Sequence, residues 1–283
     1  MIKVDVKLKK LDKFKLEDIS FEIPEGYICG LVGENGAGKT SLLHLLFGVY
    51  KPDDGKIFVD GMNFEENEKE IKDEIGVVLV EDLYDLSCTL KDNANFYGKF
   101  YSNYDEKLLD KYLNEFGLDG KRKYKKLSRG EKLKFQFAFA LSIQPKILIL
   151  DEPTGNFDPE FRNQFFDILK EFIADGTRTV ILATHLTQDL DKLADYLIYL
   201  EKGKLKFAGD IEQFREEYRL VVGEMYKLKK IPKENVIYME EKNYGAQALI
   251  RYRRRLSFDE GLEITYPTIE DFMYFMSKRR GKK

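Results

Sequence analysis

Two kinds of hydrophobic pattern alternate along this chain of 283 residues. Short, continuous apolar runs occur at residues 27–32 ("YICGLV"), 147–151 ("ILILD") and 179–183 ("TVILA"). Because a strand inside a parallel sheet is covered on both faces, such runs predict buried parallel strands. Residues 1–25 and 56–60 instead alternate between polar and apolar positions, which predicts a separate, antiparallel β layer. The pattern as a whole indicates an α/β fold.

Helical spacing of apolar residues appears between these strands. One helix is predicted directly after residue 39, where the sequence reads "TSLLHLLFGVY". A second is predicted from Ser128, because Ser128 and Glu131 have the spacing of a capping box. Helix-spaced Phe, Tyr and Leu residues, interrupted by Asn and Gly, predict a helical subdomain over about residues 82–140.

The pattern changes after residue 208. Two strand-like stretches are followed by an amphipathic helix, in which Phe272, Phe275 and Met276 share one face. Thr268 stands three residues before Asp271, the spacing of a helix cap. We therefore expect two domains, 1–208 and 209–283, the second a small α+β accessory domain for dimer contacts or regulation.

The strongest chemical signal lies between the first apolar run and the first helix. The sequence "GENGAGKT" fits the phosphate-loop pattern G-x-x-x-x-G-K-[ST], with a strand before it and a helix after it, as that motif requires. Its glycines allow backbone N–H groups to surround an anion at the positive end of the helix. The residues expected to bind the triphosphate are Gly33, Glu34, Asn35, Gly36, Ala37, Gly38, Lys39, Thr40 and Ser41. A glycine-rich turn without a ligand is the alternative, but the context favours ATP or GTP.

Acidic residues follow the second apolar run. As the end of a strand parallel to the first, this run brings Asp151 and Glu152 to the sheet edge beside the phosphate loop. Asp151 and the Thr40 hydroxyl are placed to hold Mg²⁺, and Glu152 to polarise the water that attacks the γ-phosphate. Without further context, the two acids would favour a solvated turn. The nearby phosphate loop favours the catalytic interpretation.

The chain has only two histidines, His44 and His185. His185 ends the third apolar run, at the same predicted edge, where a neutral imidazole can contact the γ-phosphate or the attacking water. A single histidine after a strand is more often structural, so both interpretations stay open. His44, inside the first helix, is interpreted as structural.

The predicted helix start at Ser128 offers a second anion site, since Gly130 allows close approach to its exposed end. By itself this is weak evidence, because most stretches of this kind are simply helix caps. The order of all these pieces, however, resembles the ATP-binding subunits of ABC transporters. "GENGAGKT" is similar to their phosphate loop, "LSRGE" to the signature motif, "ILILDEP" to the second nucleotide motif, "NFDP" to the D-loop and "ATH" to the switch histidine.

The resemblance covers about residues 1–208 and has clear implications. It implies a P-loop ABC-type nucleotide-binding domain with an antiparallel β layer and a helical subdomain. It also implies a head-to-tail dimer with two sandwiched ATP molecules, in which Ser128 and Gly130 of one subunit contact the γ-phosphate held by the other subunit. Glu152 is then the general base, His185 the γ-phosphate sensor, and Asp158 the link between the two sites.

The chain departs from the family pattern in three places, one of them the signature, where Arg129 and Glu131 replace the commoner Gly and Gln. The family usually carries a glutamine after the strand that follows the phosphate-loop helix, and here Val80 or Glu81 stands there, depending on the alignment. Of the two only Glu81 can serve as a ligand of Mg²⁺ or water. The tyrosine that usually stacks on adenine is replaced by Leu11. Phe14 is the nearest aromatic residue, and its strand-like surroundings favour a core position slightly over a stacking one.

Bulk composition limits the remaining choices. The net charge of −3 does not indicate nucleic acid as a partner, and no nucleic acid is expected. No apolar stretch approaches the roughly 20 residues of a spanning helix. Cys29 and Cys88 lack metal-site spacing and are typical of a reducing compartment. We expect a peripheral protein at the cytoplasmic face of the membrane.

The sequence therefore predicts an ATPase that powers a membrane transporter with separate permease subunits, as a homodimer or a heterodimer with a related chain. The ending "PTIEDFMYF" resembles the closing motif of the drug- and peptide-export branch, which favours export. The alternative is a soluble ABC-type ATPase that acts on ribosomes or DNA. A single set of motifs and the lack of a heptad run favour the transporter. A nucleotide-sensing module without turnover is a third possibility, against which the pair Asp151–Glu152 argues.

Overall fold

The computed structural model describes residues 1–243, 245–254 and 256–279. The chain falls into two compact units, one formed by residues 1–185 with 198–208 and the other by residues 186–197 with 209–283. Residues 186–197, which the sequence pattern assigns to the first domain, thus cluster with the second unit. Within the described residues, no helix is both long and apolar enough to cross a membrane.

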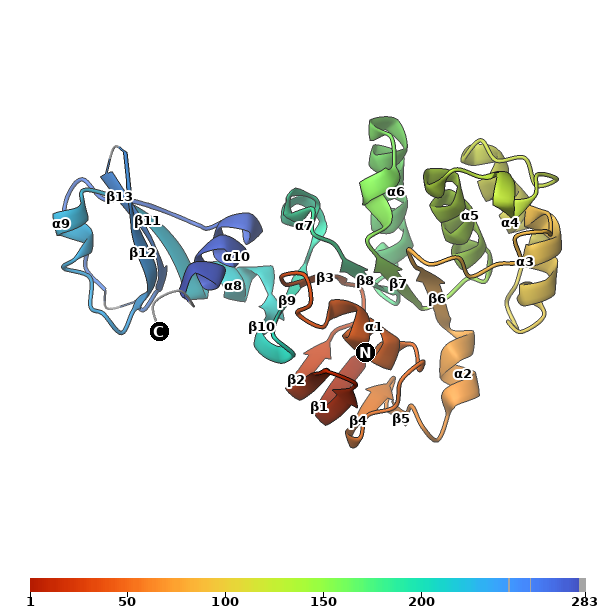
Figure 1. Ribbon diagram of the computed structural model, residues 1–283, viewed down its shortest axis with the longest axis horizontal. Coiled ribbons are helices and arrows are strands. Elements are labelled where there is room, and N and C mark those ends of the chain that lie inside the picture. Colours follow the sequence, from red (N-terminus) through yellow and green to blue (C-terminus); the bar gives the residue numbers. More distant parts are fainter. Residues whose placement is uncertain (244, 255, 280–283) are drawn as a thin grey trace. The chain divides into compact units, whose positions relative to one another are not determined.

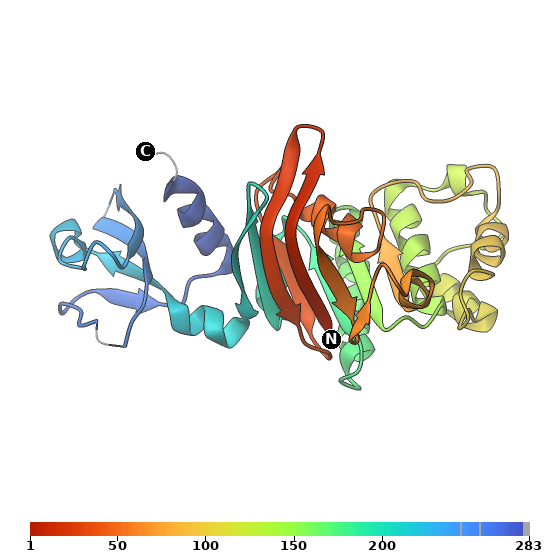
Figure 2. The ribbon, with the colours of Figure 1, turned by 90° about the horizontal axis from the view of Figure 1, so that it is seen from below.

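A ten-stranded sheet organises the first unit, in the order β5-β4-β1-β2-β10-β9-β3-β8-β7-β6 (Figure 1). The three continuous apolar runs form β3, β7 and β8, which pair in parallel and are buried throughout, as expected. The alternating segments pair in antiparallel fashion, and β1 and β2 form the long hairpin visible in Figure 2. The strands of this sheet are β1 (Ile2–Leu11), β2 (Phe14–Ile23), β3 (Ile28–Val32), β4 (Asp54–Val59), β5 (Met62–Asn63), β6 (Ile75–Val78), β7 (Ile147–Asp151), β8 (Thr179–Ala183), β9 (Tyr196–Glu201) and β10 (Lys204–Asp210).

The helices of the first unit follow the predicted positions. The phosphate-loop helix is short, and three further helices, α3, α4 and α5, lie together in both views and form the predicted helical subdomain (Figures 1 and 2). The capping box at Ser128 and Glu131 is present at the start of α5. The helices are α1 (Lys39–Leu46), α2 (Glu68–Asp73), α3 (Leu90–Gly98), α4 (Glu106–Glu115), α5 (Arg129–Ser142) and α6 (Pro159–Ile173), with 3₁₀ turns at Tyr124–Lys126 and Pro153–Asn156.

The second unit has a four-stranded sheet of its own, in the order β12-β13-β11-β14. Its helix α10 begins after Thr268, whose capping box with Asp271 is present, and the residues Phe272, Phe275 and Met276 are buried as the pattern predicts. Its elements are α7 (Thr187–Leu193), α8 (Ile211–Glu217), β11 (Tyr218–Gly223), α9 (Met225–Leu228), β12 (Val236–Lys242), β13 (Gly245–Arg251), β14 (Glu263–Thr265) and α10 (Ile269–Lys278).

Candidate active site

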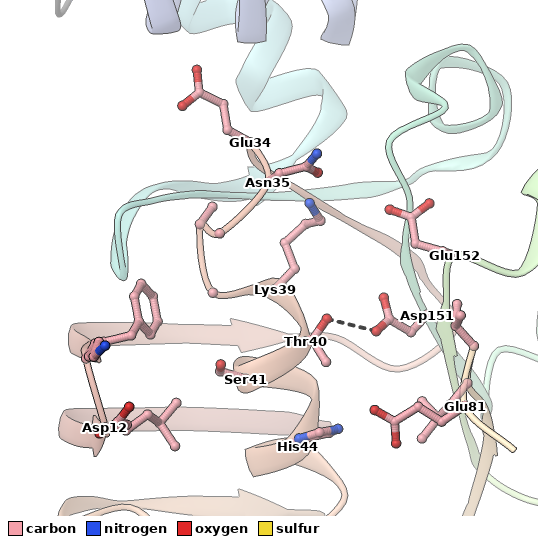
Figure 3. A pocket seen from close by; sticks show the side chains of 18 residues that line it. Asp12, Glu34, Asn35, Lys39, Thr40, Ser41, His44, Glu81, Asp151 and Glu152 are labelled. Atoms are coloured by element: carbon pink, nitrogen blue, oxygen red, sulfur yellow. Dashed lines mark hydrogen bonds between the residues drawn. The ribbon is translucent and has the colours of Figure 1, made fainter. Parts of the chain in front are cut away.

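A cavity of about 680 Å³ lies at the carboxyl edge of the parallel strands in the first unit (Figure 3). The phosphate loop from Glu34 to Ser41 forms one wall, and Asp151 and Glu152 form the opposite one. Gly38 ends the loop with φ +105°, and a Cβ placed on it would lie 2.8 Å from the Phe14 ring. A residue with a side chain would therefore be strained there and would collide with Phe14.

Lys39 is held in a position to meet phosphate. Its ammonium donates to the Gly33 carbonyl at 2.8 Å and points along the loop in Figure 3. Burial lowers the pKa of Lys39, and the nearby carboxylates of Glu152 and Asp151 oppose that shift. A buried cation with few bonds of its own is suited to bind the β- and γ-phosphates of a nucleotide.

Thr40 and Asp151 meet as the sequence predicts. The Thr40 hydroxyl donates to Asp151 Oδ2 at 2.9 Å, marked by the dashed line in Figure 3. Burial raises the pKa of Asp151, and the bond from Thr40 opposes this. The described residues contain no cluster of three or more His, Cys, Asp and Glu side chains that could hold a metal alone. One hydroxyl and one carboxylate fit Mg²⁺, which usually takes its other ligands from phosphates and water.

Glu152 and His185 form the second pair at this edge. Nδ1 of His185 lies 2.6 Å from Glu152 Oε2, and the backbone N–H of His185 donates to the same oxygen at 3.1 Å. Glu152 has φ +50°, an uncommon conformation for a residue with a side chain and one that is concentrated at functional sites. The carboxylate is thus held at the end of β7 by two contacts from the end of β8.

Val80 and Glu81 both border the cavity, in the loop after β6. In Figure 3 the Glu81 side chain points toward the pocket, on the same side as His44 and Asp151. Glu81 therefore has both the oxygen ligands and the direction needed to approach a metal or water, which Val80 lacks.

The far end of the cavity is formed by Leu11, Asp12, Lys13 and Phe14, at the turn between β1 and β2. Phe14 is half-buried and its ring packs against Gly38. Its ring therefore lies between the phosphate loop and the pocket.

Ser128, Gly130 and Asp158 do not line this cavity. Ser128 caps α5, and Asp158 caps α6 by accepting from the Phe161 N–H at 2.9 Å. A Cβ on Gly130 would lie 2.6 Å from the Asn156 carbonyl oxygen, so only glycine allows this contact between the signature and the D-loop. The two motifs form one surface, separate from the nucleotide cavity of the same chain.

Sequence reasoning missed several residues that border the cavity. Asp12 and Lys13 lie in a turn without a motif, and Leu79 precedes the altered position. His44 packs edge-on against Phe47 and Tyr50, in agreement with a structural role, but it also borders the pocket. Its place one helical turn after Thr40 was the signal available in the sequence.

Comparison with known proteins agrees with this geometry. A family model described as "ABC transporter" matches residues 16–155. The chain is 33% identical over 205 residues to the energy-coupling factor transporter ATP-binding protein EcfA2 of Clostridioides difficile, covering 69% of this chain and 71% of the relative. It is 33% identical over 212 residues to the Nod factor export ATP-binding protein I of Rhizobium sp. (strain N33), covering 73% and 69%.

A solved structure shares the fold. It is a dimeric ATP-binding cassette in a post-hydrolysis state bound to ADP and phosphate, with a TM-score of 0.66, 23% identity, and coverage of 75% of this chain and 99% of the other. The chain spans only part of other relatives. It covers 58% of the Nod factor export ATP-binding protein I of Neorhizobium galegae and 12% of the ATP-binding cassette sub-family A member 17 of Rattus norvegicus.

The fold and the site thus define a P-loop ATPase domain of the ATP-binding cassette type. The chain belongs to the ABC transporter family.

Proposed function

We propose that this chain is the ATP-hydrolysing subunit of an ABC transporter, that it works as a dimer, and that it drives separate membrane subunits. The proposal rests on one observation. Two hydrogen-bonded pairs, Thr40–Asp151 and Glu152–His185, lie at the same edge of one sheet. The first pair suits the metal of a bound nucleotide, and the second suits a water molecule in front of the γ-phosphate.

The chemistry follows from these positions. Lys39 and the phosphate-loop N–H groups bind the triphosphate, and Thr40 and Asp151 would hold Mg²⁺, which would supply positive charge against the negative charge that develops on the phosphates. Glu152 accepts a proton from the attacking water, while His185 fixes the carboxylate. We propose Glu81 as a further ligand of the metal or its water.

The dimer is supported by what one copy lacks. Ser128, Gly130 and Asp158 form a surface apart from the cavity of their own chain, so these residues meet a nucleotide only if a second copy or a related chain supplies it. The related cassette with ADP and phosphate is described as dimeric. The residues of this surface would then complete the phosphate site of the partner.

We propose that the chain serves export through permease subunits. One relative is named for Nod factor export and another for an energy-coupling factor transporter, so relatives differ in what they serve. The closing motif "PTIEDFMYF" favours the export branch. We place the protein at the cytoplasmic face of the membrane, held there by its partners.

The contact with those partners is proposed on the helical subdomain. Candidates for this contact are the stretch at residues 84–86 ("YDL") and the aromatic run at residues 95–101 ("NFYGKFY"). Tyr84 is buried among aromatic rings and cannot serve, whereas Phe96 and Phe100, 58% and 71% exposed, lie with ring centroids 6.1 Å apart. Together with exposed Leu86, these two residues are the candidate docking surface.

Two measurements test the proposal. Phosphate release from ATP by the purified chain, present with Mg²⁺ and abolished by E152Q, tests the enzyme. Gentle solubilisation of membranes from its own cell, followed by identification of co-purifying proteins, tests the partner. Recovery with a polytopic membrane protein supports the transporter, whereas recovery only with ribosomes or DNA supports the soluble alternative.

A further inference from the structure

A glutamine in the middle of the signature helix makes contacts that no motif predicts. Gln136 lies on α5, is only 1% exposed, and has buried aromatic residues on both sides, Phe135 and Phe137. A primary amide in such surroundings is costly unless it is hydrogen-bonded. Gln136 Oε1 accepts from the backbone N–H of Leu79 at 2.8 Å, and Nε2 donates to the backbone carbonyl of Glu81 at 3.1 Å.

The two bonds span one residue of the loop after β6. They bind the main chain on both sides of Val80, the segment from which Glu81 points toward the nucleotide pocket (Figure 3). β6 ends at Val78 and is the last strand of its sheet, so the ladder stops before this segment. Gln136 therefore supplies the loop backbone with hydrogen-bond partners that a neighbouring strand would supply within the sheet.

Packing alone does not hold this loop. A cavity of about 260 Å³ lies beside it, lined by Val80 and Asp82 and, from α5, by Arg129, Lys132 and Gln136 among others. One turn before Gln136, Lys132 forms an ion pair with Asp82 at 2.8 Å, in which the Asp82 side chain is 47% exposed. The bond that Gln136 Oε1 accepts is buried and the bond that Nε2 donates is partly buried, so water competes with them less than with the ion pair.

We propose that Gln136 is a positioning residue, which fixes residues 79–81 so that Glu81 faces the metal and water side of the bound nucleotide. The inference rests on the proposed function, because it needs Mg-ATP in the cavity. It also predicts a coupling between the start of α5 and this loop. Because Gln136 and Ser128 belong to the same helix, a displacement of α5 at its Ser128 end also moves the loop that carries Glu81.

The test uses Q136M, which keeps the length of the side chain and removes both bonds. S142A is the matched control, because Ser142 is also buried on α5 but its hydroxyl donates to the backbone carbonyl of Phe139 in the same helix. We expect Q136M, and not S142A, to increase hydrogen exchange at residues 79–82. If Q136M does not fold, Q136N carries the test, since its shorter side chain cannot reach both backbone groups.

A function-linked measurement separates positioning from general stability. A fluorescent ATP analogue is titrated with and without Mg²⁺. We expect Q136M to leave the affinity without Mg²⁺ unchanged and to reduce the Mg²⁺-dependent gain roughly tenfold. In an E81A background the same substitution should change that gain by less than about twofold, because its effect passes through Glu81.

Other outcomes overturn the inference. Unchanged exchange at residues 79–82 would show that Gln136 does not anchor the loop, and equal losses with and without Glu81 would show that it does not act through that carboxylate. Failure of the wild-type chain to bind ATP would instead refute the proposed function, and the exchange measurement would still decide whether the loop is anchored.

Discussion

The carboxylate of Glu152 and the imidazole of His185 lie 2.6 Å apart, and the backbone N–H of His185 adds a second contact to the same oxygen. Since an ionised carboxylate only accepts hydrogen bonds, Nδ1 carries the proton in this pair and Nε2 does not, although His185 itself does not line the cavity. These contacts leave the other oxygen of Glu152 available to a water molecule. The pair therefore combines a base with the group that orients it.

E152Q should abolish hydrolysis and preserve nucleotide binding. The amide retains the size of the side chain and an oxygen that accepts from the His185 N–H, but it cannot take a proton from water. We expect phosphate release to fall at least about 100-fold, the usual contribution of a general base. Affinity for Mg-ATP, measured by equilibrium binding, should stay within about threefold, and ATP should accumulate in a dimer seen by size-exclusion chromatography. Hydrolysis at the normal rate would remove Glu152 from the mechanism.

D151N should make the nucleotide-free protein more stable and should abolish the binding of Mg²⁺ at its metal site. Burial raises the pKa of Asp151, so its charge destabilises the fold above that pKa, and this penalty disappears as the pH falls below the ordinary value of 3.8. We expect a melting temperature at neutral pH higher by roughly 2–4 °C, the shift that about 1 kcal/mol produces in a domain of this size. The difference should vanish near pH 3.

The same variant separates stability from function. Mg-ATP should raise the melting temperature of the wild type, because a ligand that binds only the folded state stabilises it. D151N should lose most of that increase while keeping a response to ATP without Mg²⁺. A variant that is destabilised at neutral pH would contradict the inference that the contacts of Asp151 compensate the burial of its charge only in part.

E131Q should weaken the dependence of stability on acid pH. Glu131 caps α5, and its bond to the Arg122 guanidinium, aided by the Ser128 N–H, lowers its pKa from 4.5 to about 2. A lowered pKa means that the stabilisation is present above the ordinary value and is lost as the pH falls toward the folded one. Thermal unfolding between pH 6 and pH 2 should therefore show a shallower decline for E131Q. R122Q should give the same change, and a decline as steep as that of the wild type would show that the pair contributes nothing.

The proximity of the phosphate loop to Asp151 and Glu152 follows from the sequence, because the loop and the two acids come directly after strands whose apolar runs are unmistakable. Gln136 could not be found in this way. It is the one polar residue of the apolar run "FQFAFAL", but its two partners lie more than 50 residues away, and the sequence does not show which groups they are. Phe14 presents a related difficulty, since an aromatic residue at the start of a strand looks the same whether its ring enters a core or borders a pocket.

F14A should weaken the binding of ATP with little effect on turnover. Phe14 borders the cavity beyond Gly38, and stacking of a base on an aromatic ring contributes roughly 1–3 kcal/mol. We expect KM for ATP to rise about tenfold while kcat stays near the wild-type value. F14Y, which retains the ring, should behave like the wild type. Inorganic tripolyphosphate separates the two roles of the ring: if its affinity falls as much as that of ATP, Phe14 acts by supporting Gly38 and not by stacking.

Replacing Phe96 of α3 and Phe100, which follows the end of that helix, should uncouple the protein from its membrane partner. Phe96 and Phe100 contribute little to the core, since both are more than half exposed, so F96S/F100S should melt within a few degrees of the wild type and release phosphate at the same rate when purified. The double substitution removes the apolar area that the two rings offer to a partner. Aromatic residues of this kind supply much of the affinity of an interface. Recovery of a polytopic protein with the tagged chain should therefore fall at least about tenfold. Replacement of Tyr226, an exposed aromatic residue of α9, is the matched control, and equal recovery of the partner by all three chains would place the docking surface elsewhere.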